Sequence, residues 1–255
     1  LISRVGIGLD SVDLGEAKRR QITVSYTPDA PAPAVAELTL GLMLSMLRNI
    51  TTSNNSLREG QWHRYFGKRL SECKVGIIGF GRIGRRVTKL LDGFECKEIL
   101  VNDLTPPQLG SLGKNCRSVE KEDIYRQADI ISLHVPLTSS TKSMVGAEQI
   151  RLMRPDAILV NTSRGGIIDE QALHTSLVDG LLGGAAIDVF ESEPYLGPLR
   201  EVERCLLTAH MGSMTTDCRA RMEIEATEEV VRFALGKQLE NTVPASEYAI
   251  QAGET

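Results

Sequence analysis

The feature that most constrains the fold is a glycine-rich turn between an apolar run and a helical segment. The run Lys74–Ile78 leads directly into Gly79, Gly81 and Gly84, which have the spacing G-x-G-x-x-G. The first glycine allows a sharp turn, the second leaves room for a pyrophosphate beside the backbone, and the third lets the helix pack closely on the strand. The N-terminus of that helix also presents free N–H groups to an anion. The sequence therefore predicts a dinucleotide-binding unit.

An acidic residue at the end of the next apolar run indicates which dinucleotide is bound. Asp103 lies 19 residues beyond Gly84, where a carboxylate can accept hydrogen bonds from the adenosine ribose. It would repel the 2′-phosphate of NADP, and residues 104–107 supply no arginine to neutralise one. NAD is the expected cofactor, bound by Gly79, Gly81, Arg82, Ile83, Gly84 and Asp103. Each charged residue also has an alternative role without a ligand. Asp103 would then be a turn residue that ends a strand, and Arg82 would be a solvated arginine at the start of a helix.

Short apolar runs alternate with longer amphipathic segments, which is typical of a parallel sheet covered by helices on both faces. Six strands are predicted, at residues 74–78, 99–102, 130–135, 158–161, 184–187 and 205–208. Helices are predicted between them at residues 83–91, 120–128, 147–152 and 170–179. The expected fold class is α/β, with a doubly wound parallel sheet of the Rossmann type.

Two longer helical segments, residues 34–58 and 215–235, bracket this block, and Gly236 is a plausible C-cap of the second. Before the first comes a strand–helix–strand piece, at residues 2–8, 14–20 and 22–25, that is too small to hold a core alone. The sequence starts inside an apolar run without an initiator Met, so we expect the missing strands upstream. The predicted domains are a partial substrate domain (1–47), an NAD-binding domain (48–214) and a hinge helix with a C-terminal return (215–255).

The composition argues against several classes of protein. Lys and Arg total 29 against 33 acidic residues, so nothing favours nucleic acid as a partner. The longest apolar stretch, residues 35–47, is interrupted by polar residues and is too short to span a bilayer. The five cysteines are widely spaced and form no C-x-x-C pair, which favours reduced thiols in the cytoplasm. No metal site is expected.

The last three predicted strands are each followed by a polar residue that suits hydride transfer to a 2-oxo acid. These residues are Arg164, Glu193 and His210, and ligands of open α/β sheets bind at such carboxyl ends. The planar fork of an arginine matches a carboxylate. A histidine beside a carboxylate can donate or accept a proton. Glu191 competes with Glu193 for the place beside His210.

These motifs together resemble the D-isomer-specific 2-hydroxyacid dehydrogenases over nearly the whole chain. The resemblance rests on the glycine-rich turn and on residues 5–13, 36–38, 134–138 with Thr141, 161–165, 186–190 with 193–194, and 210–213. It implies that Arg164 binds the substrate carboxylate and carbonyl, that His210 is the general acid/base, and that Glu193 hydrogen-bonds His210 and raises its pKa. It also implies that Asp188 accepts a hydrogen bond from the nicotinamide carboxamide, with helix capping as the alternative.

The resemblance further implies substrate and subunit contacts. The backbone of Gly6, Ile7 and Gly8 would donate N–H groups to the substrate carboxylate. Further cofactor contacts are implied for Pro136, Thr141, Thr162, Ser163 and Gly212. The substrate domain would be flavodoxin-like, and a homodimer would form through the cofactor domain near residues 34–58. His134 ends a strand near the cofactor in the family pattern. We expect it to be a packed or solvated imidazole without a catalytic role.

The sequence thus predicts an NAD-dependent oxidoreductase that interconverts a small D-2-hydroxy acid and its 2-oxo acid. The acid could be phosphoglycerate-, glycerate/hydroxypyruvate- or lactate-like, because the first strands of the substrate domain are absent from the sequence. One rival is a non-catalytic NAD-sensing corepressor or scaffold of the same fold, which can retain the same three polar residues. A second rival is an NADP-dependent glyoxylate or hydroxypyruvate reductase, which Asp103 disfavours.

Overall fold

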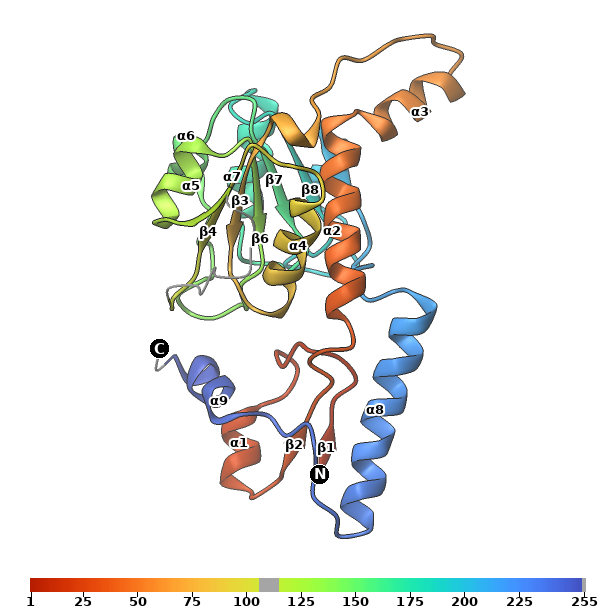
Figure 1. The fold of residues 1–255 in the computed structure, drawn as a ribbon, viewed down its shortest axis with the longest axis vertical. Helices are drawn as coiled ribbons and strands as arrows, with labels where there is room; N and C mark the ends of the chain where they lie inside the picture. Colours follow the sequence, from red (N-terminus) through yellow and green to blue (C-terminus); the bar gives the residue numbers. More distant parts are fainter. Residues whose placement is uncertain (106–114, 254–255) are drawn as a thin grey trace.

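The computed structural model of the protein describes residues 1–105 and 115–253, which form two units arranged along the long axis (Figure 1). The larger unit is built on a parallel sheet with the strand order β5-β4-β3-β6-β7-β8-β9. Its strands are β3 (Lys74–Ile78), β4 (Glu98–Asn102), β5 (Cys116–Ser118), β6 (Ile130–Leu133), β7 (Ile158–Asn161), β8 (Gly184–Ile187) and β9 (Cys205–Leu207). The order reverses between β3 and β6, which is the kind of switch point where ligands bind in doubly wound sheets.

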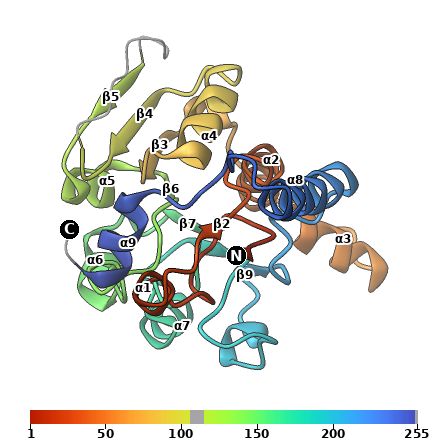
Figure 2. The same ribbon diagram turned by 90° about the horizontal axis from the view of Figure 1, so that it is seen from below.

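Helices cover both faces of this sheet (Figures 1 and 2). One face packs against α2 (Ala32–Leu47) and α4 (Arg82–Asp92), and the other against α5 (Lys121–Gln127), α6 (Ala147–Leu152) and α7 (Glu170–Val178). Two short 3-10 turns, Leu70–Glu72 and Pro198–Glu201, complete the unit. The predicted α/β class with a doubly wound parallel sheet is confirmed. Each side of the sheet has its own apolar core, because the central strands are buried on both faces.

The structure corrects the predicted number of strands, since β5 adds a seventh to the six expected. β5 is only three residues long, and Arg117 and Ser118 are exposed. A short strand with exposed polar residues at the sheet edge has no apolar run from which it could be predicted. It is nevertheless paired in parallel with β4.

The predicted helix at residues 34–58 is wrong in its length, because the structure divides it into α2 and α3 (Ile50–Arg58). Asn49 separates them with a left-handed backbone of φ 51°, a conformation that asparagine adopts more readily than most residues. The helix also begins two residues earlier than predicted, with Pro31 at its N-cap, because proline is tolerated in a first helical turn. The helix α3 and the loop after it project from the body of the molecule (Figure 1).

The smaller unit consists of a two-stranded parallel sheet flanked by helices. Its strands are β1 (Ile2–Ser3) and β2 (Val24–Ser25), and its helices are α1 (Leu14–Arg19), α8 (Thr216–Ala234) and α9 (Ala245–Ala252). The C-terminal segment returns to this unit, since the Val243 N–H donates to the Val24 carbonyl at 2.9 Å. Gly236 follows α8 with φ 64°. The sequence predicted the strand–helix–strand piece and α8 but not α9, and β1 ends at Ser3, well before the predicted residue 8. The bounds of the three domains stay a prediction.

The chain passes between the two units twice, just before α2 and just before α8. A small apolar cluster lies where these crossings meet, and it includes Ala30 and Ala34 from the first crossing and Cys218 and Met222 from α8. Val5 packs against the cluster from the smaller unit. The two crossings are therefore held beside each other.

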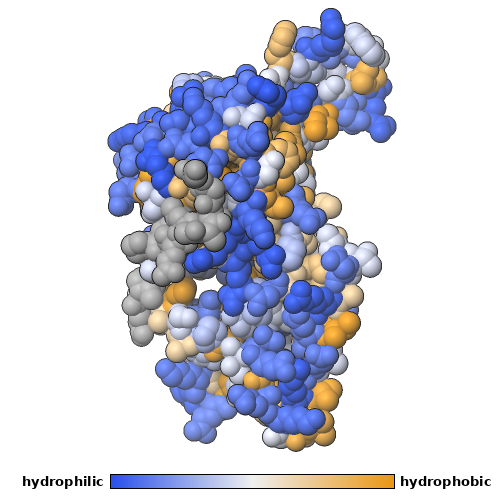
Figure 3. Space-filling model, viewed as in Figure 1, coloured by the Kyte–Doolittle hydropathy of each residue, from blue (hydrophilic) through white to orange (hydrophobic). Residues whose placement is uncertain are grey.

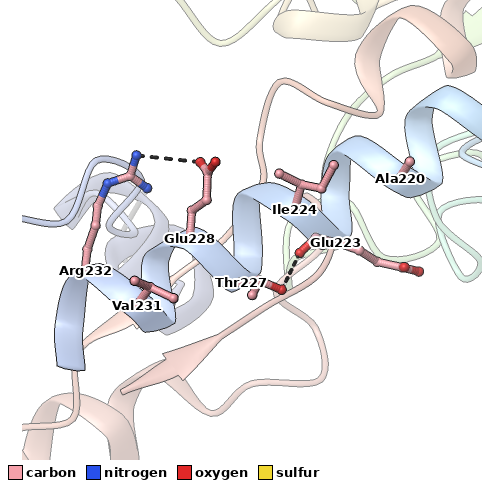
Figure 4. A pocket seen from close by; sticks show the side chains of 7 residues that line it. All are labelled: Ala220, Glu223, Ile224, Thr227, Glu228, Val231 and Arg232. Carbon is pink, nitrogen blue, oxygen red and sulfur yellow. Dashed lines mark hydrogen bonds and ion pairs between the residues drawn. The ribbon is translucent and has the colours of Figure 1, made fainter. Parts of the chain in front are cut away.

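The surface is mostly hydrophilic on the face shown in Figure 3, with apolar spots on the projecting segment and along α8. On α8 a shallow groove is lined by Ala220, Glu223, Ile224, Thr227, Glu228, Val231 and Arg232 (Figure 4). None of these seven residues belongs to the predicted site. Within the described ranges, no helix has the length and apolar character needed to cross a membrane.

Candidate active site

The glycine-rich turn joins the end of β3 to the start of α4 in very little space. Gly79 has a backbone φ of 96°, and a Cβ atom there would lie 2.5 Å from the His134 carbonyl oxygen. A Cβ atom on Gly84 would lie 2.1 Å from the Gly79 carbonyl oxygen. Around Gly81, by contrast, no atom lies within 4 Å of such a position. The first and third glycines are required for packing, and the second leaves the open space that a pyrophosphate needs.

The two charged residues predicted to face the dinucleotide lie at this turn. The Asp103 carboxylate accepts hydrogen bonds from the Phe80 N–H, within the turn, and from the Thr105 N–H. Arg82 begins α4, and its Nε donates to Asp29 Oδ1 at 2.8 Å. Pro106 and Pro107, which belong to the arginine-free stretch after Asp103, lie outside the described residues. The acid thus lies beside the glycine-rich turn, and Arg82 is paired with Asp29 from the segment that precedes α2.

The loop after β7 is organised by Asn161. Its side-chain carbonyl accepts from the Ser163 N–H (3.0 Å) and hydroxyl (2.8 Å), and its amide donates to the Arg164 carbonyl at 2.8 Å. The next residue, Gly165, lies so close to the Phe190 carbonyl that a Cβ atom would be 1.9 Å from its oxygen. The loops after β7 and β8 therefore pack directly on each other, and they fix the backbone from which Arg164 extends.

Arg164 reaches across to the smaller unit. Its Nε donates to Asp10 Oδ2 at 2.7 Å, and its Nη1 donates to the Ser163 carbonyl at 2.7 Å. Its Nη2 lies against Gly8, where a Cβ atom would be only 1.7 Å away. The predicted substrate arginine and the predicted substrate loop are thus in contact.

The substrate loop is fixed at its start. The Gly6 N–H donates to Thr27 Oγ1 at 2.7 Å, and Gly6 adopts φ 125°. That N–H already has a partner within the protein, and the contacts of Gly6, Ile7 and Gly8 with a substrate stay a prediction. The hydroxyl of Thr27 that holds the loop is fully buried.

Asp188 holds the loop after β9 in place. Its buried carboxylate accepts from the Thr208 hydroxyl (2.6 Å), the Met211 N–H (2.7 Å) and the Gly212 N–H (3.0 Å). The residue between them, His210, has a left-handed backbone with φ 50°, and its N–H donates to the Asp188 carbonyl at 2.8 Å. A non-glycine residue in this conformation is uncommon. The carboxylate of Asp188 thus stabilises an unusual turn that presents His210.

The imidazole of His210 is paired with Glu193. Its Nδ1 lies 2.8 Å from Glu193 Oε2, while Glu193 Oε1 accepts from the Phe190 N–H at 3.0 Å. Both oxygens of this carboxylate are therefore engaged, and the ring is held with Nε2 on its other side. The competing residue, Glu191, has its own N–H bound to the Glu170 carboxylate at 2.7 Å. The structure pairs His210 with the acid that the sequence favoured.

The other predicted cofactor residues lie on the loops of the same edge. Thr162 is buried, with its hydroxyl 2.8 Å from that of Thr39 on α2. The Thr141 hydroxyl donates to the Pro136 carbonyl at 2.6 Å. Ile83 lies in the first turn of α4. Their contacts with NAD stay a prediction.

His134 also lies at this edge, but it is turned into the protein. Its Nε2 is 2.9 Å from Ser132 Oγ, and its Nδ1 is buried and has no hydrogen-bond partner among the described residues. Burial lowers the pKa of His134 to about 3. The ring is therefore neutral, in agreement with the packed imidazole that the sequence suggested.

The sequence did not identify the residues that support the site. The sequence patterns assign no supporting role to Asn161, Asp10, Thr27 or Thr208. Their hydrogen-bond partners lie up to 154 positions away along the chain. These pairs are therefore visible only in the three-dimensional structure. No group of three or more potential metal ligands occurs within residues 1–105 and 115–253.

Comparison with known proteins decides the family. Residues 40–212 match the model of the D-isomer specific 2-hydroxyacid dehydrogenase, NAD binding domain. The chain belongs to this family. It is 41% identical over 241 residues to a hydroxypyruvate reductase of Thermotoga maritima, covering 91% of this chain and 76% of that protein. It is 38% identical over 247 residues to a D-3-phosphoglycerate dehydrogenase of Methanocaldococcus jannaschii, covering 95% of this chain and 47% of that protein.

Solved structures agree with this assignment. A glyoxylate reductase from Paecilomyes thermophila superposes with a TM-score of 0.88 at 30% identity, covering 96% of this chain and 75% of the other. The TT0316 protein of Thermus thermophilus gives a TM-score of 0.87 at 33% identity, covering 94% and 77%. This 2-hydroxyacid dehydrogenase therefore has the NAD-binding domain and the oxidoreductase class of its family.

Proposed function

We propose that the protein interconverts a small D-2-hydroxy acid and its 2-oxo acid with NAD as the hydride carrier. The observation that carries this proposal is the pairing of His210 Nδ1 with Glu193 Oε2 at 2.8 Å, beside a strand end that carries Arg164. An acid/base group and a carboxylate-binding group are the two elements that this reaction needs from the protein.

The cofactor and the three side chains have separate tasks. NAD would accept a hydride from C2 of the hydroxy acid, and NADH would donate one to C2 of the oxo acid. In the direction of reduction, His210 donates the proton on Nε2 to the carbonyl oxygen, and in oxidation it takes that proton back. Glu193 accepts from Nδ1 and so holds the ring with Nε2 free for the substrate. Arg164 binds the substrate carboxylate and holds C2 in a fixed place.

The fit to NAD rests on the turn after β3. Gly81 leaves open space beside the backbone, and Asp103 is at the end of the neighbouring strand. A carboxylate at this point disfavours a 2′-phosphate, so we expect NADH to bind more tightly than NADPH. Fluorescence titration of the protein with each dinucleotide measures this preference.

The assembly and location proposed from the sequence are a homodimer in the cytoplasm. The support for a dimer is the projecting segment after α2, where Ile50, Leu57, Trp62 and Phe66 are exposed and Phe66 is 99% accessible. Exposed apolar side chains of this size are typical of interaction sites. The five free thiols support a reducing compartment. Small, soluble 2-oxo acids are the proposed partners, rather than nucleic acids or membranes.

The decisive experiment follows NADH absorbance with a panel of 2-oxo acids for the wild type and His210→Ala. We expect turnover with at least one acid and a fall in kcat of at least about 100-fold in the variant, because general acid catalysis contributes that much. Tight NADH binding without turnover of any acid would overturn the proposal and favour an NAD-sensing corepressor or scaffold.

A further inference from the structure

We propose that Asp10 is a positioning residue that fixes the guanidinium of Arg164 for binding the substrate carboxylate. This inference rests on the proposed function and adds to it a residue to which no sequence motif assigns a role. Asp10 lies two residues after Gly8, at the end of the substrate loop, and it approaches Arg164 from the other unit of the molecule.

The hydrogen bonds of Arg164 define which of its donors remain for a ligand. A guanidinium has five N–H groups in one plane. Nε donates to Asp10 Oδ2 and one hydrogen of Nη1 to the Ser163 carbonyl, both at 2.7 Å. The second hydrogen of Nη1 and both hydrogens of Nη2 are left. The end of the guanidinium formed by Nη1 and Nη2 is thus assigned to the substrate, and the Nε side to Asp10.

The neighbouring glycine packs against Nη2 at that end of the guanidinium. A Cβ atom on Gly8 would lie 1.7 Å from Nη2 of Arg164 and 3.0 Å from Oδ2 of Asp10. The loop, the carboxylate and the arginine therefore fit together only when residue 8 has no side chain. Because Asp10 and Gly8 belong to the same loop, a shift of this loop moves both contacts of Arg164 together.

A role in stability does not account for this ion pair. Arg164 is 26% and Asp10 47% exposed, and pairs near the surface contribute little to the free energy of unfolding. What Asp10 does restrict is the rotation of a long side chain. Ordering such a side chain before the ligand arrives removes a cost from ligand binding. The expected effect is therefore on substrate affinity.

The test compares Asp10→Ala and Asp10→Asn with Asp13→Ala. Asp13 caps α1 by accepting from the Glu16 N–H at 2.7 Å, so it controls for damage to the same segment. We expect Asp10→Ala to raise the KM for the 2-oxo acid about tenfold, with kcat and the Kd for NADH within a factor of two or so of wild type. Asp10→Asn keeps an acceptor oxygen and should recover part of the loss. Asp13→Ala should leave KM unchanged.

A second measurement does not depend on turnover. In a protein labelled with ¹⁵N-arginine, the Nε–H signal of Arg164, assigned by its loss in Arg164→Lys, should exchange slowly with water in wild type and rapidly in Asp10→Ala. An unchanged KM, an unchanged exchange rate or an equal rise of KM in Asp13→Ala would each overturn the role of Asp10. If the wild type turns over no 2-oxo acid, the proposed function fails and the role of Asp10 fails with it, and the exchange rate then reports only the ion pair.

Discussion

The proton-transfer half of the candidate site lies on loops of one sheet, whereas the carboxylate-binding half joins the two units of the molecule. His210, Glu193 and Asp188 follow the neighbouring strands β8 and β9 and are linked by hydrogen bonds within the larger unit. Arg164 follows β7, yet it is held by Asp10 of the smaller unit. The acid/base pair is therefore assembled by the fold of one unit, and the anion site depends on how the two units meet.

The largest expected effect concerns the half that one unit assembles. Glu193→Gln should lower kcat about 100-fold, because an amide does not reproduce the two acceptor oxygens that hold His210 Nδ1 and the Phe190 N–H. The Kd for NADH should stay the same, since Glu193 does not lie at the glycine-rich turn. Steady-state kinetics and fluorescence titration measure the two quantities.

Glu191→Gln is the matched control for this prediction. It removes the same charge two residues earlier and should change kcat by no more than about twofold. An equal loss in both variants would mean that the charge of the loop matters rather than the pairing of Glu193 with His210. A loss in Glu191→Gln alone would transfer the orienting role to Glu191.

A smaller effect is expected from a change in the half that joins the units. Gly8→Ala places a methyl group 1.7 Å from the present position of Arg164 Nη2, and the flexible arginine must move away. The KM for the 2-oxo acid should rise about tenfold, because preordering of one side chain is lost, while kcat should change much less. The free energy of unfolding should fall by no more than about 1 kcal/mol.

Gly41→Ala provides the control for Gly8→Ala. Gly41 lies within α2, and a Cβ atom there meets nothing within 4 Å. Alanine in a helix interior should raise the free energy of unfolding by about 0.5–1 kcal/mol without changing KM. A wild-type KM in Gly8→Ala would show that Arg164 is not held against the substrate loop when the acid binds.

The smallest effect separates His210 from the second histidine at the same edge. Burial holds the pKa of His134 at about 3, below the value of about 6.5 for an unfolded chain. The unfolded state binds the proton between these values, so the stability contributed by the neutral ring is present above pH 6.5 or so and is lost as the pH falls. Between pH 7 and 5, the wild type should lose about 1 kcal/mol more than His134→Gln, allowing for partial exposure of the residue.

Urea denaturation at the two pH values measures this loss. His63→Gln, which changes an exposed histidine, should keep the wild-type dependence on pH. Parallel pH dependence in wild type and His134→Gln would contradict the burial of a neutral imidazole. Activity need not follow the same profile, because His134 has no place in the proposed proton transfer.

Much of the larger unit could be predicted because its signals are local. Apolar runs of four to six residues marked the central strands, and the spacing of three glycines marked the turn at Gly79. The break at Asn49 was missed because a single residue in a left-handed conformation leaves the amphipathic pattern on either side intact. The strand β5 was missed because it has little apolar character.

The candidate site was predictable only where the residue type reveals the chemistry. Arg164 and His210 are recognised by what they can bind or transfer, and each follows a strand. The partner of an arginine is not encoded near it in the sequence, since Asp10 lies 154 positions away. The same holds for Thr27, whose hydroxyl fixes Gly6. These contacts form between residues that are far apart in the sequence, and no local sequence pattern predicts them.

The paired crossings between the units have a mechanical consequence. Two chain segments that pass side by side, packed together through Ala34 and Met222, form a two-segment hinge. Such a hinge permits rotation of one unit about the line that joins the two segments, and it resists sliding and twisting of the units against each other. We expect the two units to separate along one path, so that Asp10 returns to the same place beside Arg164.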